Sequence, residues 1–176
     1  MFIISNADKP LRFVGERIRY LRESRGLSLS ELARMARIAK STLSAIESGR
    51  VSPTISTLWS IANALGVPFS SLVSEGVIIE EGGVSVRLVE RVEGADVYVM
   101  RLRGGAVRSA EAHQEGVTEF VLVVSGCALV GPKDEPKYLR ALDTHVFRGD
   151  VPHIYVAPEG DSLLVVVLKY GTRGKA

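Results

Sequence analysis

The chain has 176 residues, of which 46% are hydrophobic and 24% are charged, a composition typical of folded domains. Its longest apolar runs, such as EFVLVV and SLLVVVL, are far shorter than the roughly 20 residues of a membrane-spanning helix. The segment MFIISNADKP contains no extended apolar signal region, so we expect a cytoplasmic protein without a membrane partner. The single cysteine, Cys127, excludes an intramolecular disulfide and a thiolate zinc site.

The net charge of +2 conceals a difference between the two parts of the chain. Residues 1–75 contain 10 Lys and Arg against 6 Asp and Glu, whereas residues 76–176 contain 12 against 14. The first part is therefore the basic one, and we expect it to be the part that meets a polyanion.

From Leu11 to Val73 the apolar residues recur at helical spacing, which predicts about five short amphipathic helices. Ser28 and Glu31 have the spacing of a capping box at the start of the second helix. Three glycines stand where helices are expected to end: Gly26, Gly49 and Gly66. A capped short helix, a tight turn and another short helix follow one another, and this order favours a helix-turn-helix.

After SEGVIIEEGG the pattern changes to valine-rich runs of alternating polarity, separated by Gly, Pro and Asp turns. These runs predict short antiparallel strands in a barrel or sandwich. The expected fold class is therefore α+β with more than one domain. We predict an N-terminal arm (1–10), a helix-turn-helix domain (11–73), a linker (74–83) and an antiparallel β-barrel (84–172).

The stretch ELARMARIAKSTLSAIESG, followed by PTISTLWSIANALGVP, closely resembles the phage-repressor and Cro-like class of helix-turn-helix domains, the XRE family. In that family the second short helix lies in the major groove of double-stranded DNA. The resemblance implies that Lys40, Ser41 and Ala45 approach base edges. Four further residues, with the amides at the start of that helix, are better placed for phosphates: Thr42, Ser44, Ser48 and Arg50.

Three positions depart from the family's pattern. Leu29 stands where a glutamine usually bonds a phosphate, Arg37 replaces the turn glycine, and Ala39 replaces a Ser or Thr cap. Losing a cap commonly costs about 1 kcal/mol, which the core can absorb. Since only Lys40 is long enough to reach guanine O6 and N7, we predict modest base specificity, partly from DNA shape. A helical bundle that serves another purpose, such as dimerisation, is the alternative.

The stretch EAHQEGVTEF holds the candidate site of the second half. On an extended strand His113 and Glu115 would point to the same face. The stretch is similar to the first motif of the cupin superfamily: His113, Glu115, Glu119 and Gly126 fall at that motif's spacings, with Glu115 where a second histidine belongs. His153 matches the histidine of the second motif. The resemblance implies a jelly-roll β-barrel.

It also implies a ligand set of His113, Glu115, Glu119 and His153. Two imidazoles and two carboxylates can bind Zn²⁺, Fe²⁺, Mn²⁺ or Ni²⁺. A metal-free pocket, in which these side chains hydrogen-bond a small-molecule effector, and a barrel without any ligand are the alternatives. His145, in DTHVF, could point inward as a further pocket residue, or it is a strand histidine with a hydrogen-bond partner.

A repressor-like helix-turn-helix followed by a cupin is the architecture of prokaryotic one-component regulators. The resemblance implies operator binding by the first domain and sensing of a metabolite or metal by the barrel. A homodimer would place two recognition helices about 34 Å apart and prefer a palindromic operator.

Two other functions remain as alternatives. One is a non-haem metal-dependent cupin enzyme, similar to the iron-dependent epoxidase that makes fosfomycin. Its triad maps onto Glu115, Glu119 and His153, so the triad's first histidine is missing. The other is an architectural DNA binder whose barrel acts only as a dimer clamp.

Overall fold

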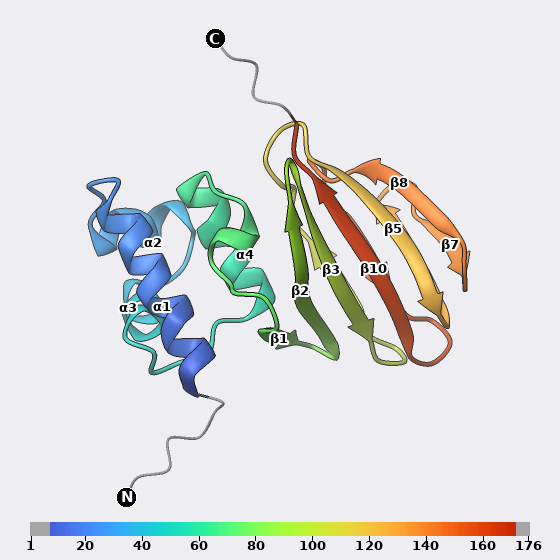
Figure 1. Cartoon of the computed structure of the whole chain (residues 1–176), viewed down its shortest axis with the longest axis horizontal. Helices are drawn as coiled ribbons and strands as arrows, with labels where there is room; N and C mark the ends of the chain where they lie inside the picture. Colours follow the sequence, from blue (N-terminus) through green and yellow to red (C-terminus); the bar gives the residue numbers. More distant parts are fainter. Residues whose placement is uncertain (1–7, 172–176) are drawn as a thin grey trace, which may run out of the picture. The chain divides into compact units, whose positions relative to one another are not determined.

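The computed structural model describes residues 8–171, with side chains from residue 13 onward. The chain divides into two compact units, Met1–Val77 and Ile78–Ala176, one helical and one built of strands (Figure 1). The division falls inside the segment predicted as a linker, residues 74–83, of which residues 78–81 are strand. The predicted arm is helical from Asp8, and its residues 1–7 lie outside the described residues. Within the described part, no helix is long and apolar enough to cross a membrane.

The described part of the helical unit contains four α-helices and one 3₁₀ turn (Figure 1). They are α1 (Asp8–Glu23), α2 (Leu29–Met35), α3 (Lys40–Glu47), α4 (Ile55–Leu65) and η1 (Phe69–Ser71). In place of a fifth α-helix, the chain forms a single 3₁₀ turn. Its helical segment after Pro68 has only three residues and ends at Leu72.

Local hydrogen bonds explain where these helices begin. The capping box of α2 is present: the Glu31 amide donates to Ser28 Oγ at 3.2 Å, and the Ser28 amide donates to Glu31 Oε2 at 2.7 Å. The turn before α3 passes through Arg37 with φ of 54°, a left-handed conformation that glycine adopts at less cost. Ala39 precedes α3 and gives it no side-chain cap. The order of a capped helix, a turn and a second helix is therefore as predicted.

The helical core is apolar, but one buried ion pair joins α1 to α3. Arg22 donates from Nε to Glu47 Oε1 at 2.7 Å and from Nη2 to Glu47 Oε2 at 2.8 Å. Both side chains are less than a tenth exposed. Gly15 brings α1 close to the end of α3, because a Cβ there would lie 2.2 Å from the Ile46 carbonyl oxygen. Four residues, all fully buried, form the centre of this core: Ile18, Leu32, Leu43 and Leu58.

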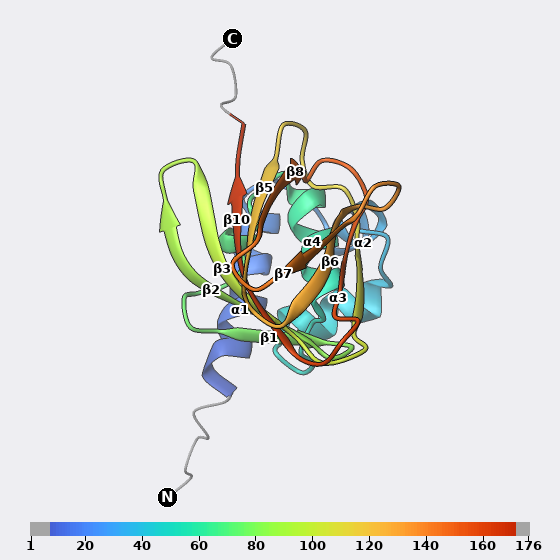
Figure 2. The same cartoon turned by 90° about the vertical axis from the view of Figure 1, so that its right-hand side faces the viewer.

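The strand unit consists of two antiparallel sheets in its described residues (Figure 2). The strands are β1 (Ile78–Glu81), β2 (Val84–Val92), β3 (Ala95–Leu102), β4 (Val107–Ala110), β5 (Thr118–Ser125), β6 (Cys127–Pro132), β7 (Lys137–Arg140), β8 (Thr144–Arg148), β9 (His153–Val156) and β10 (Ser162–Lys169). One sheet has the order β1-β2-β3-β10-β5-β8 and the other β4-β9-β6-β7. The predicted antiparallel jelly-roll is present as two sheets that do not close into one continuous barrel.

Alternate residues of each strand face the space between the sheets, as the period of two requires. On β10 these are Leu164, Val166 and Leu168, all nearly fully buried. Polar residues replace apolar ones on β5 and β9, where Glu119 and His153 are 0% and 1% exposed. A charged residue is rarely buried so completely unless it is paired, so this end of the interior is the candidate site.

Candidate functional site

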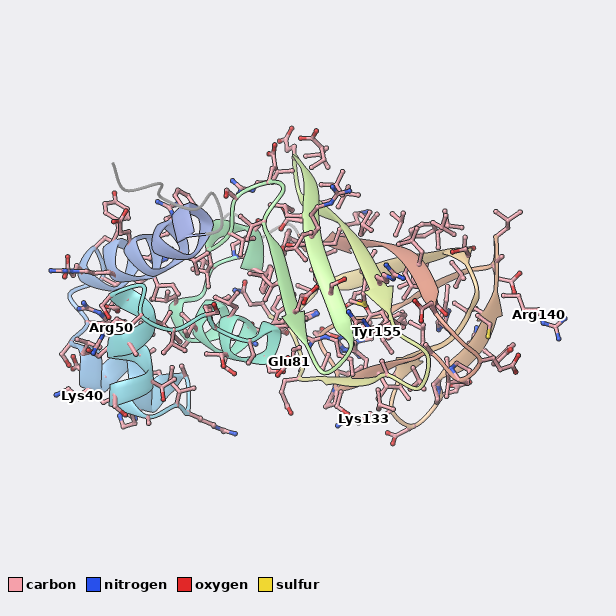
Figure 3. All side chains as sticks on the ribbon, turned by 90° about the horizontal axis from the view of Figure 1, so that it is seen from below. Lys40, Arg50, Glu81, Lys133, Arg140 and Tyr155 are labelled. Atoms are coloured by element: carbon pink, nitrogen blue, oxygen red, sulfur yellow. The ribbon has the colours of Figure 1, made fainter. Side chains whose placement is uncertain are left out.

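The residues predicted to contact DNA lie along and just beyond α3. Lys40, Ser41 and Thr42 form its exposed first turn, and Ser44 and Ala45 are half-buried further along. Ser48 and Arg50 are exposed after the helix ends, and Figure 3 labels Lys40 and Arg50 beside α3. Leu43 and Ile46 are buried on the opposite side, so the helix presents a polar surface of short side chains with one long one, Lys40.

Ser48 and Arg50 are hydrogen-bonded to each other. Ser48 Oγ donates to the Ser44 carbonyl oxygen at 2.8 Å and accepts a hydrogen bond from Arg50 Nε at 2.8 Å. This arrangement holds the Arg50 guanidinium beside the end of α3 while its other N–H groups can donate to a phosphate.

In the strand unit, three predicted ligands converge. His113 comes from the loop between β4 and β5, Glu119 from β5 and His153 from β9. His113 Nε2 lies 2.7 Å and His153 Nε2 lies 3.1 Å from Glu119 Oε1. One ligand atom from each residue lies within 4.8 Å of the others. We call these three residues the His-Glu-His group.

Close backbone packing positions this group. The His113 amide donates to the Gly149 carbonyl oxygen at 2.9 Å, which anchors the β4–β5 loop against the turn after β8. A Cβ at Gly149 would lie 2.9 Å from Glu119 Cγ and 3.1 Å from His113 Cδ2. Only a residue without a side chain therefore leaves room for both side chains in these positions.

The electrostatics of the group make Glu119 a carboxylate. Burial alone would raise the pKa of Glu119, but the adjacent imidazole rings of His113 and His153 outweigh it and lower that pKa below its usual range. Burial would lower the pKa of His153, yet the Glu119 carboxylate raises it overall. The ring of His153 is fixed from its other side, because Nδ1 lies 2.8 Å from the Val151 carbonyl oxygen.

Tyr155 completes the surroundings of Glu119 and was missed by the sequence analysis. Its hydroxyl donates to Glu119 Oε2. Burial and the Glu119 charge raise its pKa well above the usual value, so Tyr155 stays neutral and remains a donor. Figure 3 shows Tyr155 inside the strand unit. The signal in the sequence is HIYV, in which Tyr155 follows His153 by two residues and must share its face of the strand.

A buried arginine lies beside Tyr155. Arg108, on β4, is paired in register with Tyr155 on β9, and its Nη1 donates to Glu81 Oε2 at 3.3 Å. Burial lowers the pKa of Arg108, partly offset by the charge of Glu81. This arginine was not identified from the sequence either, since VRSA reads as an ordinary strand with one surface charge.

Two predicted site residues stand apart from the group. Glu115 is exposed and does not join the group, because β4 ends at Ala110 and β5 begins at Thr118. His113 and Glu115 both lie in the loop between these strands, and the side-chain alternation of a strand does not apply there. His145 is half-buried on β8, with its ring centroid 5.3 Å from that of Phe147. The Phe147 ring in turn lies 5.5 Å from His153, so His145 adjoins the group through an aromatic ring.

The three converging side chains differ from the triad that was mapped from the sequence. The sequence mapping used Glu115 and therefore lacked a histidine. The structure brings together two histidines and one carboxylate, His113, His153 and Glu119. This donor set suits Zn²⁺ and the other first-row divalent ions that imidazole and carboxylate bind.

Comparison with known proteins agrees with the geometry of the helical unit. The helix-turn-helix family model (HTH_3: Helix-turn-helix) matches residues 18–72. The HTH-type transcriptional regulator SutR of Escherichia coli (strain K12) is 30% identical over 154 residues, which cover 82% of this chain and 86% of SutR. The chain belongs to the HTH-type transcriptional regulators.

Other members of this regulator family match both units. PuuR of Escherichia coli (strain K12), also an HTH-type transcriptional regulator, is 26% identical over 158 residues, covering 80% of this chain and 85% of PuuR. The crystal structure of an HTH_3 family transcriptional regulator from Vibrio cholerae superimposes with a TM-score of 0.83 at 25% identity, covering 94% of this chain and 99% of that one. The predicted XRE-type helix-turn-helix regulator is thereby confirmed, and the protein is a DNA-binding transcriptional regulator.

Proposed function

We propose that the strand unit of this regulator senses a divalent metal ion, alone or together with a small-molecule effector, and so controls operator binding by the helical unit. The observation that carries the proposal is the buried Glu119 carboxylate, with imidazole nitrogens of His113 and His153 at 2.7 and 3.1 Å. Donor atoms bound to one ion at about 2.1 Å, at angles of about 90 to 109°, lie about 3.0 to 3.4 Å apart. The two measured separations are close to that spacing.

The surroundings of the group fit the exchange of protons for a metal ion. The contact between His153 Nδ1 and the Val151 carbonyl oxygen orients Nε2 toward Glu119. Losing the Nε2 proton leaves a lone pair directed into the group, which is the form that binds a metal. Tyr155 holds the other oxygen of Glu119, as residues next to metal ligands commonly do. A bound Zn²⁺, Fe²⁺, Mn²⁺ or Ni²⁺ would supply positive charge to the buried carboxylate oxygen Oε1, which has no hydrogen-bond partner.

We propose a homodimer that binds a palindromic operator through two copies of α3. One α3 contains a single long side chain suited to guanine, Lys40, among short ones, so one helix offers little base discrimination. Two helices about 34 Å apart would read two half-sites. A ligand changes operator affinity only if it binds one dimer geometry better than another. Because an operator is read inside the cell, we propose that the protein acts in the cytoplasm.

The test compares metal binding with DNA binding in the same tag-free, metal-stripped protein. Zn²⁺, Fe²⁺, Mn²⁺ and Ni²⁺ are titrated by calorimetry, and affinity for promoter DNA is measured by fluorescence anisotropy at one fixed salt concentration. We expect one ion per chain and a change in DNA affinity on loading. Glu119→Gln should weaken metal binding by at least tenfold, whereas Glu115→Gln, at an exposed position, should leave it unchanged.

Two results would overturn parts of this proposal. Equal metal affinity in wild type and Glu119→Gln would refute the His-Glu-His group as the metal site. Metal binding without any change in DNA affinity would refute its regulatory role. A metal-free sensor would instead show stabilisation of stripped protein by a metabolite, about 2.7 kcal/mol at 100 times the dissociation constant.

The complete set of two histidines and one carboxylate also fits a metal-dependent enzyme, which is the second candidate. The chain is similar to SutR and PuuR over most of their length, and both are transcriptional regulators. This similarity supports a regulator without catalysis. Oxygen consumption by the iron-loaded protein with candidate substrates, lost in Glu119→Gln, would favour the enzyme.

A further inference from the structure

The outer face of the six-stranded sheet is an apolar surface that the metal-sensing proposal does not use. Inward-facing residues alternate with outward-facing ones, so the neighbours of buried Glu119 and Val121 on β5 point away from the interior. Phe120 is 37% and Val146 58% exposed on this face. The half-buried residues of the face are Val97, Val99, Leu122, Val165 and Val167.

Strand register arranges these residues in two adjacent rows. Each row crosses β2, β3, β10, β5 and β8 in that order. One contains Glu90, Val97, Val167, Phe120 and Val146, and the other contains Arg87, Val99, Val165, Leu122 and Thr144. Each row therefore has an exposed charge on β2 and uncharged side chains from β3 to β8, and Ile78 on β1 extends the row of Arg87 at its other end. We call the two rows the outer-face patch.

We propose that the outer-face patch is the surface through which two copies of this chain dimerise. The inference rests on the proposed homodimer and names its interface. Consider a two-fold axis that lies between the outer faces of the two copies and runs parallel to the rows. It places each row opposite the other row of the partner and keeps β2 opposite the partner's β2. Glu90 then faces the partner's Arg87, and Arg87 faces the partner's Glu90. The uncharged remainder of each row packs on the uncharged remainder of the other.

The alternative two-fold axis, parallel to the strands, is less favourable. It places β2 of one copy opposite β8 of the other, so Glu90 and Arg87 would face Val146 and Thr144. Burying charges against uncharged side chains costs free energy without an ion pair to offset it. Charge complementarity therefore selects the first orientation, which also matches the aligned packing common between β-sheets.

The outer-face patch has the size of the centre of a dimer interface. Four strands about 4.8 Å apart and two rows about 6.7 Å apart give an apolar surface of about 260 Å². A stable interface buries about 800 Å² per partner. The patch thus supplies about a third of the surface needed as its apolar centre, and charged residues such as Arg87 and Glu90 belong to its polar rim.

Sedimentation equilibrium of the full-length, metal-free protein without DNA tests the interface. We expect a wild-type dimer at micromolar concentration. Val165→Lys, at the centre of the patch, should weaken dimerisation at least tenfold. The control Val107→Lys, at a 64% exposed position on the four-stranded sheet, should not. Circular dichroism and thermal unfolding establish that both variants are folded.

A charge swap tests the orientation and does not depend on Val165→Lys folding. Glu90→Arg and Arg87→Glu should each weaken dimerisation about tenfold, because each places like charges opposite one another twice per dimer. The double variant should recover the wild-type dissociation constant within about threefold. A monomeric wild type, with the patch covered by the chain's own helical unit or by another partner, would overturn the proposal. So would single swaps without effect, or a double swap that only adds their losses.

These outcomes are independent of the metal-sensing test. The sedimentation experiment uses neither metal nor DNA, so a failure of the His-Glu-His group to bind metal leaves its result unchanged. Conversely, a protein that dimerises elsewhere could still bind metal at Glu119.

Discussion

The buried ion pair between α1 and α3 allows a quantitative prediction. Replacing Arg22 by Met removes the hydrogen bonds of 2.7 and 2.8 Å to Glu47 and leaves the Glu47 carboxylate, only 6% exposed, without its guanidinium. Breaking a buried pair on one side costs about 3 to 5 kcal/mol. In a unit of this size each kcal/mol lowers the midpoint of thermal unfolding by about 4 to 8 °C. Arg22→Met should therefore lower the midpoint of the helical unit by at least about 12 °C.

Trp59 makes this change measurable in the full chain. It is the single tryptophan of the sequence and stacks on Phe69 with ring centroids 4.6 Å apart, so its fluorescence in urea reports unfolding of the helical unit. Arg19→Met, which breaks an exposed pair with Glu23, is the matched control and should cost less than about 1 kcal/mol.

The double variant Arg22→Met with Glu47→Met separates the two contributions. It leaves no buried charge, so it should be more stable than Arg22→Met alone. Equal losses of stability in Arg22→Met and Arg19→Met would refute the reasoning. So would a double variant whose loss of stability equals the sum of the losses in Arg22→Met and Glu47→Met.

Three further substitutions test other contacts. Gly15→Ala should cost the helical unit about 1 to 3 kcal/mol in urea unfolding, because its Cβ would lie 2.2 Å from the Ile46 carbonyl oxygen; unchanged stability would contradict that close packing. Lys40→Ala should weaken operator binding by about 1 to 3 kcal/mol in anisotropy titrations if Lys40 reads a guanine, and an equal loss on unrelated DNA would instead assign it to a phosphate. Gly149→Ala places a Cβ 2.9 Å from Glu119 Cγ and should weaken metal binding measured by calorimetry, whereas wild-type affinity would show that the ligands tolerate the displacement.

The helical unit was predictable to the extent that its determinants are local. The Ser28 and Glu31 capping box and the apolar spacing both act within one or two turns, and both are found where the sequence placed them. The Arg22 and Glu47 pair was not predicted, because these residues lie 25 positions apart and each resembles an ordinary surface charge on its own helix. Which charge becomes buried depends on how the helices pack.

The candidate site shows the same limit. Motif spacing located His113, Glu119 and His153, which the structure brings together. The inclusion of Glu115 assumed that the segment before β5 is extended, and a loop there leaves its side chain exposed. Tyr155 follows from strand alternation alone once His153 is known to point inward. Its contact with Glu119 does not, since β5 and β9 belong to different sheets.

A single strand connects the two proposals. On β5, Glu119 points into the His-Glu-His group, and its neighbour Phe120 points into the outer-face patch. Metal binding would replace the direct contacts of Glu119 Oε1 with His113 and His153. A resulting shift of the Glu119 backbone would move Phe120, whose side chain lies on the opposite face of the same strand. Because the packed interior resists gradual deformation, such a shift would favour one arrangement of the dimer over another. In that case metal should change the dissociation constant of the dimer as well as operator affinity, and by linkage dimerisation should change metal affinity by the same factor.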